Sequence, residues 1–445
     1  MTSPSTEQVS PQTLRKVIIA AGIGNFVEWF DFAVYGFLAT TIAQQFFPSG
    51  DASAALLKTF AVFAVAFAFR PLGGIFFGML GDRIGRKRTL AMTILLMAGA
   101  TTLIGLLPTY AAIGVTAPIL LSLIRCAQGF SAGGEYAGAC AYLMEHAPSD
   151  KRAWYGSFVP VSTFSAFAAA AVVAYALETS LSAEAMGSWG WRLPFLIAAP
   201  LGLVGLYLRW KLDETPAFQA VKQEHAVAHS PLKETLRNHG AAICCLGAFV
   251  SLTALSFYMF TTYFATYLQV AGGLSRAAAL LVSLIALIFA AAICPLAGLY
   301  SDRVGRRITV MTACALLIVV VFPSFLMASS GSFAASIVGV MMLAVGAVLC
   351  GVVTAALLSE TFPTRTRYTA SAITYNMAYT IFGGTAPLMA TWLISTTGSN
   401  LSPAFYLIAV ALLALAGGLA LPETSRVSLH DVGSEEKDVA PLLSR

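Results

Sequence analysis

Gly78-Met-Leu-Gly-Asp82-Arg83-Ile-Gly85-Arg86-Lys87-Arg88 lies between two long apolar runs, and a closely similar stretch returns as Gly298-Leu-Tyr-Ser-Asp302-Arg303-Val-Gly305-Arg306-Arg307. The leading glycines are 220 positions apart (298 − 78), as are the aspartates (302 − 82). A short cationic turn repeated at about half the chain length predicts two halves that are built alike. Its glycines allow two helix ends to come close, and its arginine and lysine side chains cannot enter lipid. Each copy is therefore expected at a membrane surface.

The composition excludes an ordinary soluble protein. Of the 445 residues, 58% are hydrophobic and only 11% are charged, and the mean hydropathy is +0.78. Soluble domains carry about 25% charged residues. The chain is therefore predicted to be an all-α membrane protein. Residues 1–14 lack the pattern of a cleaved signal, so the first apolar run is expected to stay in the mature protein.

A membrane-spanning helix needs about 20 mostly apolar residues. Twelve stretches meet this requirement: 17–44, 57–80, 89–108, 116–144, 155–178, 191–210, 241–270, 277–300, 308–328, 333–360, 370–396 and 403–421. With the repeated turn they predict twelve transmembrane helices in two pseudo-symmetric six-helix bundles, residues 17–210 and 241–421. A polar cytoplasmic linker (211–240), with a surface helix around 216–226, is expected to join them. Short cytoplasmic tails (1–16 and 422–445) flank the bundles.

The distribution of cationic residues predicts the orientation. If the N-terminus is cytoplasmic, most Lys and Arg residues of the loops fall on the inside, and the opposite loops hold only Lys58, Arg192 and Arg276. This is the positive-inside pattern. We therefore expect a multi-pass protein of the cell (plasma or inner) membrane with both termini cytoplasmic.

The first apolar stretch carries two acids within the membrane. Glu28, Asp31 and Tyr35 are spaced i, i+3 and i+7, which places them on one helix face, and Asn25 extends that polar stripe. A charged side chain at the bilayer centre costs about 2.5–3.5 kcal/mol on insertion scales, so such residues usually face a cavity. The stripe predicts a substrate or proton pathway, and the alternative is a structural network with a neighbouring helix.

A cation follows in the second apolar stretch. Arg70 precedes Pro71, which lacks an N–H and loosens the helix locally. The Arg70 guanidinium is expected to pair with Asp31 or Glu28, or to bind a substrate carboxylate in bidentate fashion. These options are compatible, because a substrate can displace an internal partner.

The fourth apolar stretch predicts a proton site. Arg125, Gln128 and Glu135 lie along one broad face, which two overlapping GxxxG patterns interrupt, Gly129/Gly133 and Gly134/Gly138. The glycines predict close approach of another helix, which would bury Glu135. Burial disfavours a charged carboxyl and a nearby Arg favours it, so Glu135, with Asp31 and Arg125, is a candidate for proton coupling. The alternative is a fixed Arg125–Glu135 ion pair that only holds helices together.

The second half is more neutral and more aromatic. Its candidates for substrate binding are Tyr258, Tyr263 and Asn376. Aromatic stripes usually serve packing or an interfacial belt, but a quaternary ammonium favours π-faces within about 6 Å. The seven cysteines all fall in or beside apolar segments and predict small buried residues. No metal or cofactor is expected.

The repeated turns are the candidate gate. A single copy would be taken as a solvated turn, but duplication at matched positions favours a functional role. Asp82 and Asp302 are expected to hold the cytoplasmic ends of the two halves together in an outward-facing state. The gate residues proposed from the sequence are Gly78, Asp82, Arg83, Gly85, Arg86, Asp302, Arg303, Gly305 and Arg306.

Several stretches together resemble one family. They are Gly24-Asn25-Phe-Val-Glu28-Trp29-Phe30-Asp31, Arg70-Pro71-Leu-Gly73-Gly74, Gln128-Gly129-Phe-Ser-Ala-Gly133-Gly134-Glu135-Tyr136, Trp189-Gly190-Trp191-Arg192-Leu-Pro194-Phe195 and Phe362-Pro363-Thr-Arg365-Thr-Arg367-Tyr368. With two six-helix halves, the chain resembles the major facilitator superfamily, and within it the metabolite:H⁺ symporter family of proline/glycine-betaine, α-ketoglutarate, citrate and shikimate carriers. The proline/betaine branch is the most similar, through Arg70–Asp82, Leu201–Phe218 and Phe362–Tyr368. Osmosensing members of that branch carry a long C-terminal coiled coil, whereas the tail here is short, so transport without an osmotic set point is expected.

The resemblance implies an H⁺-coupled symporter that works by alternating access. One deep anchor for a carboxylate, Arg70, together with acids and aromatic rings suits a small zwitterion such as proline or betaine. The alternative is an organic acid of the α-ketoglutarate, citrate or shikimate type, for which Arg125 is the only other deep cation. A non-transporting membrane sensor is the alternative of a different class. No motif of an enzyme or a nucleotide-driven pump is present in the sequence. The expected partners are the small-molecule substrate, protons and the lipid bilayer, with no nucleic acid, and a monomer is expected.

Overall fold

The computed structural model describes residues 11–48, 52–144, 146–210, 237, 239–363 and 366–425. All regular elements in these ranges are helices. Before the undescribed segment they are α1 (Pro11–Phe37), α2 (Ala39–Phe46), α3 (Ala52–Ala68), α4 (Arg70–Ile84), α5 (Arg86–Leu106), α6 (Tyr110–Ile113), α7 (Thr116–Ala132), α8 (Glu135–Met144), α9 (Arg152–Gly156), α10 (Phe158–Ser180), α11 (Ala183–Ser188), η1 (Gly190–Arg192) and α12 (Leu193–Trp210). After it they are α15 (Gly240–Tyr258), η2 (Met259–Tyr263), α16 (Phe264–Val270), α17 (Arg276–Val304), α18 (Arg306–Ala328), α19 (Phe333–Glu360), α20 (Arg367–Ala378), η3 (Tyr379–Gly383), α21 (Ala386–Thr397) and α22 (Ser402–Leu419).

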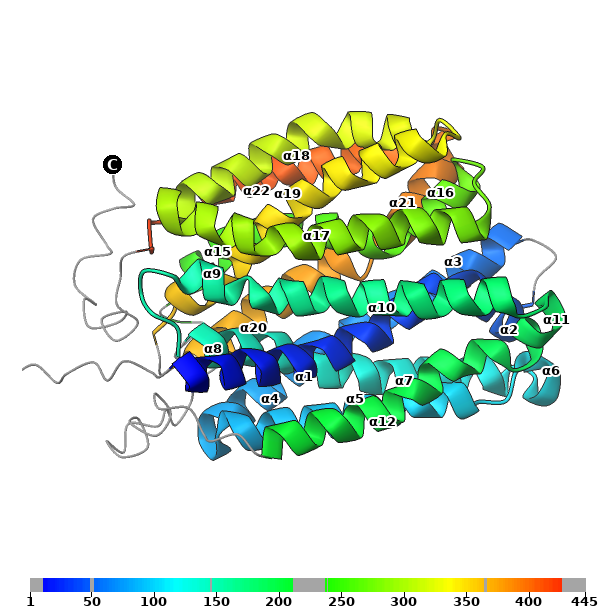
Figure 1. Cartoon of the computed structure of the whole chain (residues 1–445), viewed down its shortest axis with the longest axis horizontal. Coiled ribbons are helices and arrows are strands. Elements are labelled where there is room, and N and C mark those ends of the chain that lie inside the picture. Colours follow the sequence, from blue (N-terminus) through cyan, green and yellow to red (C-terminus); the bar gives the residue numbers. More distant parts are fainter. Residues whose placement is uncertain are drawn as a thin grey trace, which may run out of the picture.

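These helices form two groups that lie side by side with their long axes roughly aligned (Figure 1). The helices α1–α12 make up one group, and α15–α22 make up the other. The first helix begins, and the last one ends, at the same end of the molecule. The domain boundaries predicted at 17–210, 211–240 and 241–421 remain a prediction. Most of the linker with its surface helix, and most of the two tails, lie outside the described residues.

Within the described ranges, eleven helices are long and apolar enough to cross a membrane. They coincide with eleven of the twelve predicted stretches, which confirms those stretches as candidate spans. The stretch 116–144 is different, because α7 ends at Ala132 and α8 begins at Glu135. A single continuous helix there was the wrong prediction. The carbonyls of Gly133 and Gly134 accept hydrogen bonds from the side chains of Asn376 and Tyr368, so donors from the other group of helices bind at the break.

The two copies of the repeated turn have the same backbone geometry. Gly85 connects α4 to α5 with φ 101°, and Gly305 connects α17 to α18 with φ 93°. Only glycine adopts such angles without strain. In each copy a threonine hydroxyl four residues later donates to the glycine carbonyl, Thr89 at 2.9 Å and Thr309 at 2.7 Å. This shared geometry agrees with two halves built alike. We call the end of the molecule that carries these glycines the turn end, and the other the opposite end.

Two transmembrane stretches contain a π-helical turn. The turn η2 follows Tyr258 inside the stretch 240–270, and η3 begins at Tyr379 inside the stretch 367–397. A π-helical turn holds one more residue than an α-helical turn and often occurs at functional sites. Both turns lie in the second group of helices.

Close packing in the first group depends on glycines, as predicted. A Cβ on Gly129 would lie 1.8 Å from the carbonyl oxygen of Ala66, and one on Gly133 would lie 2.2 Å from that of Arg70. The backbones of α3, α4 and α7 therefore touch. Glu135, two residues after Gly133, is only 2% exposed.

Gly133→Ala is expected to destabilise the protein, because its Cβ would overlap backbone atoms that cannot move aside. Overpacking of this kind costs about 1–3 kcal/mol. The midpoint of thermal unfolding of the purified protein should fall by several degrees. Gly99→Ala is the matched control, since nothing lies within 4 Å of a Cβ at that position of α5. Equal midpoints for both variants would contradict the prediction.

Candidate functional site

A fully buried cation lies between the two groups of helices. The guanidinium carbon of Arg70, a residue with 0% exposure, lies 5.2–6.0 Å from the centroids of five aromatic rings. We call these rings the Arg70 cage: Trp29, Phe32, Phe67, Tyr375 and Tyr379. The first three come from α1 and α3, and the last two from α20 and η3. Both halves of the chain therefore contribute to one site.

The polar contacts of Arg70 also join the two halves. Its Nε donates to Oδ1 of Asn376 at 3.3 Å, and its Nη2 donates to the carbonyl of Ala132 at 3.5 Å. The same Nη2 lies 3.6 Å from Oε1 of Glu28. Nη1 is buried and has no hydrogen-bond partner among the described residues. The predicted pairing of Arg70 with Glu28 is present, and one guanidinium nitrogen still has donor capacity.

Tyr258 extends this site from α15. Its ring centroid lies 5.2 Å from that of Phe67 and 6.0 Å from that of Tyr379. The hydroxyls of Tyr258 and Tyr375 are buried, and neither finds a hydrogen-bond partner in the described part of the chain. Buried polar groups are normally satisfied, so unsatisfied groups gathered in one place indicate a ligand or water. Next to the spare nitrogen of Arg70, these hydroxyls favour a site for a small polar ligand.

A second buried charged group lies beside the first. Arg125 donates to Gln128 (2.8 Å), Gln128 donates to the Thr101 hydroxyl (2.5 Å), and that hydroxyl donates to Asp31 (2.6 Å). The Arg125 guanidinium carbon also lies 4.0 Å from the centre of the Tyr35 ring. Asp31 and Arg125 therefore belong to one network, and Tyr35 covers it.

The alternative considered for Arg125, a fixed ion pair with Glu135, is wrong. Glu135 accepts a hydrogen bond from Thr93 at 2.7 Å, whereas Arg125 bonds to Gln128. The expectation assumed one continuous helix face. Because α7 ends before Glu135, the two residues lie on different helices.

Glu28 and Glu135 line the same small cavity. Its volume is about 10 Å³ and its wall includes Thr93 and Ser131. This is about the space that one water molecule needs. The two acids come from α1 and α8, and the other lining residues come from α5 and α7. The cavity therefore lies where these four helices of the first group meet.

Two further candidates from the sequence lie away from this cluster. The side-chain nitrogen of Asn25 donates to acceptors on α10, including Thr163 at 2.7 Å, and its oxygen accepts from Trp29 at 3.0 Å. Asn25 thus connects α1 to α10 and orients one ring of the cage. The ring of Tyr263 lies near that of Tyr267, with the two centroids 6.0 Å apart and the planes tilted by 45°. Direct substrate contacts of Asn25 and Tyr263 remain predictions.

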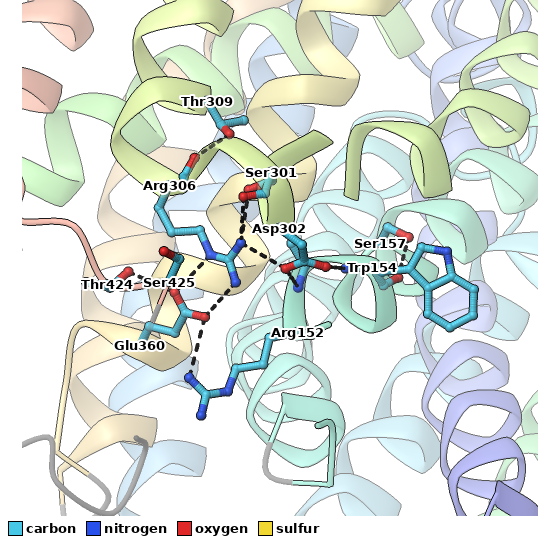
Figure 2. Close-up of polar contacts among 12 residues, drawn as sticks. Arg152, Trp154, Ser157, Ser301, Asp302, Arg306, Thr309, Glu360, Thr424 and Ser425 are labelled. Atoms are coloured by element: carbon cyan, nitrogen blue, oxygen red, sulfur yellow. Dashed lines mark hydrogen bonds and ion pairs between the residues drawn. The ribbon is translucent and has the colours of Figure 1, made fainter. Parts of the chain in front are cut away.

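The turn end carries a buried network of ion pairs (Figure 2). Arg306, 1% exposed, binds both carboxylate oxygens of Glu360 at 2.9 and 3.0 Å and one oxygen of Asp302 at 3.0 Å. Arg152, from the first group of helices, lies 3.8 Å from Glu360. The Thr424 hydroxyl donates to the same acid at 2.8 Å. Bidentate pairing of this kind fixes geometry strongly.

Asp302 connects the two groups of helices directly. The backbone N–H groups of Ala153 and Trp154 donate to its two oxygens at 3.0 and 2.9 Å (Figure 2). Gly298 allows this approach, because a Cβ there would lie 2.7 Å from the carbonyl oxygen of Ala153. A gate residue of the predicted kind has to make such a connection between the halves.

The other predicted gate residues have different environments. Gly78 packs against Tyr368 and Thr369 of the second group, and Arg303 is exposed. The backbone of the first turn is described, but the side chains of Asp82, Arg83 and Arg86 lie outside the described residues. Their part in a gate stays a prediction.

The groups also touch at the opposite end. Arg276, at the start of α17, lies 3.2 Å from the carboxylate of Glu178 on α10 and donates to Thr41 on α2 at 2.8 Å. Nearer the cage, the hydroxyl of Thr380 in η3 donates to the carbonyl of Phe67 at 2.7 Å. A Cβ on Gly36 would lie 2.9 Å from the side chain of Thr262 in η2. Contacts between the groups thus flank the site on both sides.

Several residues of these sites were not among the candidates predicted from the sequence. Trp29 and Tyr375 were not singled out, because single rings in apolar helices normally serve packing. Arg152 and Glu360 could have been found from a repeated spacing in the sequence. An acid followed seven residues later by an arginine occurs as Glu145…Arg152 and again 215 positions on (360 − 145) as Glu360…Arg367.

Comparison with known proteins identifies the class to which this fold and site belong. The Major Facilitator Superfamily model matches residues 21–387. The solved structure of the proton:xylose symporter XylE bound to 6-bromo-6-deoxy-D-glucose has a TM-score of 0.78 at 18% identity and covers 96% of this chain and 99% of its own. The chain belongs to the Major Facilitator Superfamily.

Particular relatives cover nearly the whole sequence. The proline/betaine transporter of Salmonella typhimurium is 39% identical over 96% of this chain and 87% of its own. The glycine betaine/proline/ectoine/pipecolic acid transporter OusA of Dickeya dadantii is also 39% identical, with the same two coverages. The ectoine/proline transporter ProP of Corynebacterium glutamicum is 36% identical over 96% of this chain and 88% of its own.

Proposed function

We propose that this protein is a secondary active transporter that carries a small zwitterion of the proline and glycine betaine type together with protons. The observation that carries the proposal is the buried Arg70 inside a cage of rings from both halves. A guanidinium binds a carboxylate well, and aromatic faces bind a quaternary or protonated nitrogen. Proteins of this architecture move a substrate by rocking two halves about a central site. The names of the three relatives support the same class of solute.

An organic acid is the second candidate, and Arg125 is the observation that favours it. Its Nε and Nη2 are buried and have no hydrogen-bond partner among the described residues. A dicarboxylate would use Arg70 and Arg125 as its two anchors. Arg192, which the sequence places in a loop, donates to the carbonyls of Gly105 and Leu107. The rings around Arg70 favour the zwitterion, because aromatic faces attract a cationic nitrogen and not a second carboxylate.

Competition in proteoliposomes tests the substrate class. Uptake of labelled glycine betaine under an imposed pH gradient should be strongly inhibited by unlabelled proline and by ectoine. Citrate and α-ketoglutarate should leave it nearly unchanged. Inhibition by the acids and none by proline would overturn the zwitterion and support the organic acid. Binding of these solutes with no uptake at all would support the sensor.

Proton coupling is assigned to Asp31 and Glu135, with Arg125 controlling the charge of Asp31. Both acids are buried, at 1% and 2% exposure, and each accepts a hydrogen bond from a threonine. An ionisable group inside the membrane that faces a cavity is a functional candidate. Glu135 meets this description through the cavity that it shares with Glu28.

The turn end is assigned to the cytoplasm, because its cationic residues follow the positive-inside pattern. On this assignment both tails are cytoplasmic, the membrane is the cell membrane and the working unit is a monomer. The contacts of Asp302 and Arg306 close the cytoplasmic side. The Arg276–Glu178 pair closes the other side.

Asp302→Asn is expected to slow turnover by roughly tenfold while leaving substrate affinity and folding nearly unchanged. The amide keeps the shape but loses the charge that binds two backbone N–H groups and Arg306, which is worth about 1.5–3 kcal/mol per charged hydrogen bond. The outward-facing state, which these bonds hold together, becomes less populated. Initial uptake rates, the Kd and the unfolding midpoint measure the three quantities. Asp82→Asn is expected to act in the same way.

Asp150→Asn is the matched control for this prediction. Asp150 is exposed and precedes α9 by two residues. Its replacement should leave the uptake rate unchanged. Wild-type rates in Asp302→Asn would remove the gate role.

A further inference from the structure

The ion pair of Arg70 and Glu28 occupies the position at which the proposed substrate carboxylate has to bind. The two side chains are 0% and 3% exposed, and the distance from Nη2 to Oε1 is 3.6 Å. A direct charge-assisted hydrogen bond is shorter, about 2.7–2.9 Å. Nη1 of Arg70 has no hydrogen-bond partner among the described residues. A carboxylate that engaged both terminal nitrogens would therefore bind Arg70 better than Glu28 does.

We propose, building on the transport function above, that the carboxylate of the zwitterion replaces Glu28 at Arg70 and that the displaced Glu28 takes up the coupled proton. The proton comes from solvent and forms an O–H bond on a carboxylate oxygen of Glu28. No other bond forms or breaks. Release of the substrate carboxylate returns Arg70 to Glu28, which then loses the proton.

The cost of an unpaired buried charge drives the protonation. A carboxylate that loses its cation in a buried site becomes neutral, because the charged form is far too unfavourable there. The nitrogen end of betaine cannot replace Arg70 as a hydrogen-bonding partner, because a quaternary ammonium has no N–H. Its natural place is against the rings of the cage. Glu28 is therefore left facing the cavity that it shares with Glu135.

That cavity supplies both a second reason for protonation and a route for the proton. Two carboxylates that share one site cannot easily be charged together. The cavity has about the volume of one water molecule, and Thr93 and Ser131 add hydroxyls to its wall. A proton on Glu135 can thus reach Glu28 through hydroxyls or water. In this scheme Glu135 passes the proton on, and Glu28 is the acid that takes it up when the substrate binds.

The other titratable groups near Glu28 come from several helices. Tyr258 of α15 lies beside the cage, with its ring centroid 5.2 Å from that of Phe67. Asp31 follows on the same helix but accepts from Thr101, whose hydroxyl is linked through Gln128 to Arg125 of α7. The described charged side chains of the packed helices α5 and α10 lie at the ends of those helices, namely Lys87, Arg88 and Glu178. The described ion pair of Glu28 is the one with Arg70.

Such an exchange couples substrate binding and proton binding positively. Linkage requires that each ligand strengthens the binding of the other by the same factor. Above the pH at which Glu28 loses its proton, the Kd for the zwitterion should rise about tenfold per pH unit, because one proton must be bound with each substrate. The zwitterion then enters with one net positive charge.

Proton uptake on binding tests the proposal without any transport measurement. Purified full-length protein in a weakly buffered solution with a pH indicator is mixed with glycine betaine, and the bound betaine is measured in parallel. The wild type should take up about one proton per bound betaine, and its Kd should rise with pH as above. Betaine binding with no proton uptake, from weakly acidic to weakly alkaline pH, overturns the exchange but leaves the proposed substrate class intact. No binding of betaine, proline or ectoine overturns the proposed function itself.

Glu28→Gln separates the proposal from a structural role. The variant should bind betaine without proton uptake and with a Kd that does not change with pH. At alkaline pH it should bind more tightly than the wild type, because no charged side chain competes for Arg70. A residue that only supports the fold would weaken binding at every pH. Proton uptake in this variant equal to the wild type would place the proton elsewhere and overturn the proposal. Glu184→Gln, an exposed acid on α11, is the matched control and should behave as the wild type.

Discussion

Arg70→Lys is expected to raise the Kd for glycine betaine by roughly thirty- to hundredfold and to reduce uptake in proportion. Arg70 holds Asn376 and Ala132 with two nitrogens, while a third has no protein partner and can take a carboxylate. A lysine ammonium is a compact point charge without the planar fork of a guanidinium. It therefore cannot donate to Asn376, to Ala132 and to a substrate carboxylate in the same geometry. Loss of one hydrogen bond to a charged group costs about 2–3 kcal/mol, which corresponds to that change in Kd. Calorimetry on the purified protein measures it.

Arg88→Lys provides the control for Arg70→Lys. Arg88 is exposed on α5 and carries the same positive charge outside the site. Its replacement should not change the Kd. If Arg70→Lys bound betaine as tightly as the wild type, the guanidinium could not be the anchor. The substrate carboxylate would then have to bind at Arg125.

Glu135→Gln is expected to abolish uphill accumulation while substrate exchange continues. Accumulation against a gradient needs net proton movement, and exchange of internal for external substrate does not. Glu135 is buried beside the shared cavity and accepts a hydrogen bond from Thr93, which a glutamine can also accept. Folding should therefore be kept. The measurements are accumulation driven by an imposed pH gradient and counterflow without one.

The same pair of measurements on Asp31→Asn decides between the two acids. Asp31 accepts from Thr101 within the network of Arg125, so its neutralisation also removes the acid from that network. Glu184→Gln should accumulate substrate like the wild type. If Glu135→Gln and Asp31→Asn both still concentrate substrate, the assignment to these acids is wrong.

The spans could be predicted from the sequence because crossing a membrane is a local requirement. Each span needs a run of apolar residues, and eleven of the predicted runs are helices of that kind in the described chain. The repeated turns could be predicted for the same reason, since their glycines and arginines are neighbours in sequence. The break in the stretch 116–144 could not be predicted in this way, because its partners are distant in sequence. It binds Asn376 and Tyr368, which lie 243 and 234 positions away along the chain.

The site was predictable where charge alone decides the outcome. Arg70, Glu28 and Asp31 are buried, as charged residues in apolar helices were expected to be. Which of them pair depends on helix rotation, and the sequence does not contain that information. Thus Arg70 meets Glu28 as one of two predicted options, while Arg125 bonds to Gln128 instead of Glu135. Trp29 and Tyr375 were missed because a ring that binds a cation looks like a ring that fills a core.

The contacts of Asp302 between the halves also could not be predicted from the sequence. The sequence placed the residue at a membrane surface and in a repeat. Its partners are backbone N–H groups of Ala153 and Trp154, which any residue type except proline could supply. No pattern of side chains could have revealed them.

The π-helical turns η2 and η3 have a consequence for how the opposite end can move. Each residue of a helix accounts for about 100° of rotation and 1.5 Å of rise. When the extra residue of a π turn shifts one place along its helix, a side chain changes the direction it faces, while the helix stays continuous and hydrogen-bonded. Thr262 in η2 and Thr380 in η3 are the residues that touch Gly36 and the carbonyl of Phe67 across the boundary between the halves. These contacts can therefore be made and released by local rotation of single residues.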